Sequence, residues 1–97
     1  MKLSFRKSGG FAPVFMGCIF DTDAKPEPEL EALVKSSKIM EQTSKKHPSA
    51  RDVFYFTFTI DMNGTNKSVT FDQLNVPQEV EPLLNYLLER STNMLPE

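Results

Sequence analysis

Among the side chains that could take part in chemistry, three aspartates come closest to forming a motif. Asp21 and Asp23 are separated by one residue, directly after an apolar run, and Asp61 precedes an Asn-Gly pair. Each carboxylate is a hard oxygen ligand of the kind that zinc and calcium ions accept. The spacing does not continue into the alternating acids and final glutamate of a calcium loop, so we expect no metal site of the protein's own. As turn residues, all three also have an ordinary structural interpretation.

The remaining reactive side chains predict no catalytic arrangement. The single histidine, His47, lies in a basic stretch without periodicity, and the single cysteine, Cys18, lies inside an apolar run. One cysteine excludes an internal disulfide and a Cys-only metal site, and this position favours a buried small hydrophobe. The sequence lacks a Ser-His or Cys-His arrangement, a His-Glu-x-x-His motif and a phosphate-binding glycine loop. We therefore expect a binding protein without a cofactor, and not an enzyme.

An apolar side chain stands where the chain is expected to reverse. The segment Gly9-Gly10-Phe11-Ala12 separates the alternating residues 2–7 from an apolar run over 13–20. The two glycines supply positive φ at little steric cost, but a turn tip normally carries Asn, Asp or Ser where Phe11 stands. Phe11 therefore either folds back over the sheet or is presented to a partner, and the sequence leaves both possibilities open.

Periodicity predicts the elements that position these groups. Alternation of apolar and polar residues indicates strands, and apolar residues three and four apart indicate amphipathic helices. The expected elements are strands over 2–7 and 13–20, a helix over 28–37, strands over 53–60 and 67–72, and a last helix that starts near Asn75 or Pro82. The sequence predicts an α+β fold of order ββαββα, with a four-stranded, mainly antiparallel sheet and two helices on one face. Residues 1–97 form a single domain in this interpretation.

The connection through residues 41–51 is long enough for two topologies. If the two hairpins are antiparallel throughout, both tips project from one end of the sheet and Phe11 neighbours Asp61. If the helix over 28–37 makes a parallel crossover, the Asp21–Asp23 loop neighbours Asp61, and Phe11 lies at the opposite end.

The composition of the chain limits the kinds of partner that we expect. The net charge of −2 over 97 residues argues against a nucleic-acid footprint, although residues 35–51 carry five bases against one acid. No apolar run approaches a membrane span, and the N-terminus does not have the pattern of a signal peptide. We expect a cytoplasmic monomer that binds neither nucleic acid nor membrane.

Four segments together resemble the emfourin family over the length of the chain: Ser8-Gly9-Gly10-Phe11-Ala12, Asp21-Thr22-Asp23, Asp52-Val53-Phe54-Tyr55 and Pro82-Leu83-Leu84-x-Tyr86-Leu87. The resemblance implies a small bacterial protein that inhibits thermolysin-family zinc metallopeptidases, particularly protealysin-like enzymes. It further implies that a loop aspartate ligates the enzyme's catalytic zinc, while a nearby loop puts apolar side chains into the substrate subsites.

The implied mechanism has named candidates. Asp21 and Asp23 come first because they belong to the resemblance, Asp61 is the reserve, and Gly9, Gly10, Phe11 and Ala12 form the apolar loop. A catalytic zinc keeps one open position, which a carboxylate oxygen can take at about 2.0–2.2 Å. The alternative is a non-catalytic interaction module that binds another chain through a sheet edge or the outer face of strand 53–60.

Overall fold

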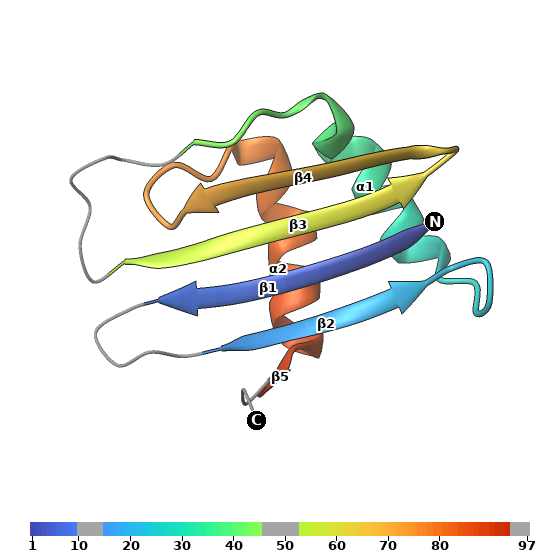
Figure 1. Cartoon of the computed structure of the whole chain (residues 1–97), viewed down its shortest axis with the longest axis horizontal. Coiled ribbons are helices and arrows are strands. Elements are labelled where there is room, and N and C mark those ends of the chain that lie inside the picture. Colours follow the sequence, from blue (N-terminus) through green and yellow to red (C-terminus); the bar gives the residue numbers. More distant parts are fainter. Residues whose placement is uncertain (10–14, 46–52, 94–97) are drawn as a thin grey trace.

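The computed structural model describes residues 1–9, 15–45 and 53–93 of the chain (Figure 1). The predicted α+β class and the order ββαββα are confirmed for these residues. The elements are β1 (Lys2–Gly9), β2 (Met16–Asp21), α1 (Pro28–Ser37), the short helix η1 (Ile39–Glu41), β3 (Phe54–Met62), β4 (Thr65–Asp72), the short helix η2 (Gln78–Val80), α2 (Glu81–Arg90) and β5 (Thr92–Asn93).

The order of the strands decides between the two topologies. Within the described residues the sheet has the order β4-β3-β1-β2-β5, and every neighbouring pair is antiparallel. β2 and β3 therefore flank β1 and run parallel to each other, so α1 belongs to a crossover that passes from one side of β1 to the other (Figure 1). This is the second topology that the sequence allowed.

The core lies between the sheet and the two helices. α1 and α2 cover the same face of the sheet, as predicted, and lie behind it in Figure 1. Phe5 of β1 is opposite Phe58 of β3, and their ring centroids are 5.2 Å apart. The fully buried side chains of this layer include Leu3, Phe5, Leu30, Ile39, Phe58, Ile60, Phe71, Leu83 and Leu87.

Both helices begin at a proline-containing first turn. Pro28 opens α1, and Pro82 is in the first turn of α2, where a missing N–H costs no hydrogen bond. Asn75, one of the two starts that the sequence predicts for the last helix, does not cap it, because no side chain caps the start of η2 or α2. Its amide instead donates to the buried carboxylate of Asp72, with N···O distances of 2.8 and 2.9 Å.

The edges of the sheet differ from the sequence expectation. β5 follows the last element that the sequence predicts, and it pairs with Met16 and Gly17 of β2. Ser44 and Lys45 belong to the connection 41–51, for which the sequence predicts no element, yet both bond to β4: Lys45 N–H donates to the Thr70 carbonyl at 2.9 Å, and the Ser44 hydroxyl accepts from Thr70 N–H at 2.9 Å. β2 is not covered on both faces, since Ile19 is 69% exposed.

Candidate functional site

The candidate carboxylates lie at one end of the sheet, around the first residue of β1. Lys2 is opposite Asp21 of β2 on one side and opposite Asp61 of β3 on the other, and Asp23 follows two residues beyond Asp21. Gly9 lies at the other end of the eight-residue β1. At about 3.3 Å per residue, the two ends are roughly 23 Å apart.

Asp21 shapes the turn that follows β2. Its Oδ1 accepts hydrogen bonds from the backbone N–H groups of Asp23 at 3.1 Å and Ala24 at 3.3 Å. The next residue, Thr22, is 6% exposed, and its N–H donates to the carbonyl of Met1 at 2.9 Å. These bonds fasten the turn to the start of β1, so the Asp21 carboxylate has a structural role.

Asp23 projects from this turn. Its side chain is 83% exposed, and Oδ2 lies 2.9 Å from the amine of Met1. Within the described part of the chain no other bond to this carboxylate is found, so Oδ1 is open to an outside ligand. One oxygen orients the side chain, and the other faces solvent.

Asp61 is the second exposed carboxylate at this end. It lies opposite Asn66 on β4 as well as Lys2 on β1, and among the described residues no hydrogen bond or ion pair to its side chain is found. The hairpin tip beyond it has positive φ at Asn63 (53°) and Gly64 (77°). These are the angles of a type I′ turn, as the Asn-Gly pair predicts.

The apolar loop is described only at its first residue. Gly10, Phe11 and Ala12 lie outside the described residues. Gly9 has φ of +90°, and a Cβ at this position would lie 2.8 Å from the carbonyl oxygen of Val53. Gly9 is therefore required by the backbone packing of β1 against the start of β3.

The described residues offer no metal-binding cluster. No group of three or more His, Cys, Asp or Glu side chains in this part of the chain could hold a metal ion. His47 lies outside the described residues. Burial raises the pKa of the Cys18 thiol, which lies 3.6 Å from the carbonyl oxygen of Leu87, so this thiol is a poor nucleophile near neutral pH. Over the described ranges, no helix is long and apolar enough to cross a membrane.

One known protein family matches most of the chain. The Emfourin family profile matches residues 5–88, which include all of β2, β3 and β4 and most of β1 and α2. The chain belongs to the Emfourin family. That membership indicates a protein of the protease-inhibitor type. No curated protein and no solved structure matches the chain.

Sequence reasoning missed the contacts that distinguish the carboxylates. The Emfourin resemblance pointed to Asp21 and Asp23 as a pair, but only the structure separates the turn-forming carboxylate from the exposed one. Lys2 gave no signal either, because its place between Asp21 and Asp61 depends on the order of the strands.

Proposed function

We propose that the protein is a reversible inhibitor of thermolysin-family zinc metalloproteases, in particular protealysin-like enzymes. The observation that carries this proposal is the match to the Emfourin family over residues 5–88. The exposed carboxylates of Asp23 and Asp61, which lie at one end of the sheet, support it. A carboxylate at this end would take the open coordination position of the enzyme's zinc.

Asp23 is the zinc-directed residue in this proposal. A carboxylate that ligates a metal is commonly held through a second interaction, and the Met1 amine provides one for Oδ2. A side chain already oriented loses less conformational entropy on binding, which favours affinity. Asp61 remains the reserve candidate, and Asp21 supports the turn.

In this proposal the apolar loop does not share the zinc-proximal subsite with Asp23. β1 separates the Gly9 end from the Asp23 end by roughly 23 Å, whereas the first subsite beside a zinc ligand is only a side chain away. We therefore assign the zinc-directed role to the Asp23 end. The alternative is that the Gly9 end of β1, where the apolar loop begins, enters the cleft instead.

A steady-state assay tests the proposal. Hydrolysis of a small peptide substrate by a protealysin-like enzyme is measured over a range of concentrations of the protein and of the substrate. We expect competitive, reversible inhibition, with the protein intact by mass spectrometry afterwards. Unchanged hydrolysis by several such enzymes at micromolar concentration of the protein would contradict the proposal.

One observation favours the alternative function of an interaction module. Within the described residues β5 pairs with β2 only at Met16 and Gly17, and Ile19 further along β2 is 69% exposed. An unpaired edge with an exposed aliphatic residue can add a strand from another chain. The outer face of β3 is less suitable than expected, because Thr57 and Thr59 bond there to hydroxyls of β4. Such a module would leave protease activity unchanged, so the same assay separates the two functions.

A further inference from the structure

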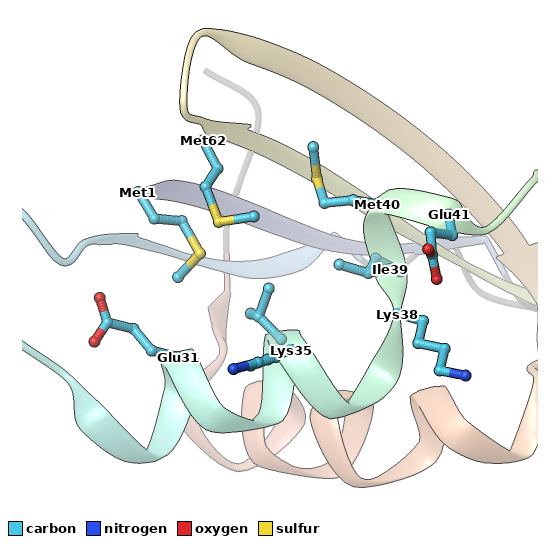
Figure 2. Close-up of a pocket in the computed structure, with 9 residues that line it drawn as sticks. Met1, Glu31, Lys35, Lys38, Ile39, Met40, Glu41 and Met62 are labelled. Carbon is cyan, nitrogen blue, oxygen red and sulfur yellow. The ribbon is translucent and has the colours of Figure 1, made fainter.

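A pocket opens at the same end of the molecule as Asp23 and Asp61. It has a volume of about 490 Å³ and lies between α1, η1 and the ends of β1 and β3 (Figure 2). Three methionines, two aliphatic residues and four charged residues line it: Met1, Met40, Met62, Val34, Ile39, Glu31, Lys35, Lys38 and Glu41. A cavity of this size with mostly apolar walls is typical of a binding site.

The walls of the pocket are adaptable. Met1 and Met62 reach from the sheet toward α1, and Met40 comes from η1 (Figure 2). Met40 and Met62 are half-buried, whereas Val34 and Ile39 are buried. Unbranched thioether side chains change conformation at low cost and fit apolar groups of different shapes. The pocket is therefore suited to an aliphatic group.

The rim of the pocket carries charges of both signs. Glu31, Lys35, Lys38 and Glu41 are all exposed, and none of them forms an ion pair within 4.0 Å in the described part of the chain. Their formal charges cancel. A lipid anion would meet as many carboxylates as ammonium groups here, whereas a folded protein surface supplies partners for both. The charge pattern thus favours a polypeptide as the occupant.

The pocket adjoins the proposed zinc-directed residue. The amine of Met1 contacts Asp23 while its side chain lines the pocket, and Met62 directly follows Asp61. A protease–inhibitor contact of ordinary size buries roughly 800 Å² on each partner. One turn and one hairpin tip supply only part of such an area. A partner seated on Asp23 would therefore extend over the mouth of this pocket.

We infer that this pocket receives an aliphatic side chain from the surface of the bound metalloprotease, outside its catalytic cleft. The inference rests on the proposed function and deepens it. The catalytic zinc that the carboxylate contacts is common to all enzymes of that class. The pocket, in contrast, selects an enzyme that carries an aliphatic residue flanked by charges at the matching place. The pocket then contributes target selectivity as well as affinity.

Polar, isosteric substitutions test the inference. Met40→Gln and Met62→Gln, singly and together, keep the length of each side chain and make the walls polar. Leu74→Gln is the matched control, because Leu74 is 67% exposed and follows β4 at the opposite end of the sheet. We expect the double variant to lose roughly ten- to a hundredfold in inhibition constant, as for an aliphatic side chain that is no longer fully buried in an apolar site. The control should match the wild type.

A second measurement does not depend on how the variants fold. Wild-type protein labelled with ¹³C at the methionine methyl groups is titrated with the protease, and the Met40 and Met62 signals are followed. Both should shift at saturation. Unchanged signals in the saturated complex overturn the inference, as do equal inhibition constants for wild type and a folded double variant. In both cases the proposed function stands. If the wild type inhibits no enzyme of the class, the proposed function falls and the inference falls with it.

Discussion

Asp21 and Asp61 end the two strands that flank β1, and both lie opposite the same residue, Lys2. This relationship follows from the crossover between β2 and β3, and it brings a loop and a hairpin that are forty residues apart in the chain to one end of the sheet. Lys2 between them reduces the repulsion of the two carboxylates. A partner that contacts one carboxylate therefore meets a surface on which the other is close by.

Asp23→Asn should weaken inhibition of the target protease more than any other aspartate substitution at this end. The change keeps the shape of the side chain and removes the charge that an open zinc site favours. Loss of one partner of a desolvated charged contact costs about 2–5 kcal/mol, so the inhibition constant should rise roughly thirty- to several-thousandfold. Asp61→Asn and Asp21→Asn should have small effects, with melting temperatures near that of the wild type. A large loss at Asp61 alone would transfer the role to that residue.

Phe11→Ala should leave the inhibition constant unchanged, because Gly9 places the start of that loop at the end of the sheet opposite Asp23. The inhibition constant and the melting temperature are measured on the same variant. A loss of roughly ten- to a hundredfold with an unchanged melting temperature would mean that Phe11 is buried in a subsite, and would contradict our assignment of the zinc-directed end. A lowered melting temperature would instead mean that Phe11 packs in the core.

Gly9→Ala should destabilise the fold. The residue has φ of +90°, and the added Cβ would meet the Val53 carbonyl oxygen at 2.8 Å. Backbone strain and overpacking together should lower the free energy of unfolding by about 2–4 kcal/mol. Gly64→Ala is the control, since φ is +77° there and nothing lies within 4 Å of the added Cβ. Urea unfolding compares the two, and an equal loss in both would mean that the contact with Val53 is unimportant.

Cys18 should react slowly with iodoacetamide at pH 7.5. Burial raises the pKa of its thiol, so the thiolate fraction at this pH is smaller than that of an ordinary cysteine. The rate of alkylation, followed by mass spectrometry, should lie below that of a cysteine in an unfolded peptide and should rise in urea. A rate equal to that of the peptide in the folded protein would contradict this.

The elements could be predicted from the sequence because each carries its own local pattern. Phe54, Phe56 and Phe58 alternate, Asn63-Gly64 is a type I′ turn signal, and Pro28 opens α1. The order of the strands could not be predicted, since a connection as long as 41–51 constrains neither topology. The bonds of Asp72 to Asn75 and of Ser44 and Lys45 to β4 were missed for a related reason. These hydrogen bonds depend on a local geometry that no periodic pattern in the sequence predicts.

The same limit applied to the site. The family resemblance named Asp21 and Asp23, and the turn before Asn63-Gly64 added Asp61 as the reserve. The chemical difference between Asp21 and Asp23 depends on tertiary contacts: backbone N–H groups for Asp21 and the Met1 amine for Asp23. The methionine pocket had no sequence signal, because Met1, Met40 and Met62 are far apart in the chain and meet only after the crossover.

The most direct test of the central claim is spectroscopic. The catalytic zinc of a protealysin-like enzyme is replaced by cobalt(II), whose visible absorption depends on its coordination, and the spectrum is recorded during titration with the protein. We predict that the wild type changes the spectrum to saturation at one equivalent, while Asp23→Asn, at a concentration that still saturates the enzyme, does not reproduce the change. A cobalt spectrum unaltered by saturating wild-type protein would contradict carboxylate ligation of the catalytic metal.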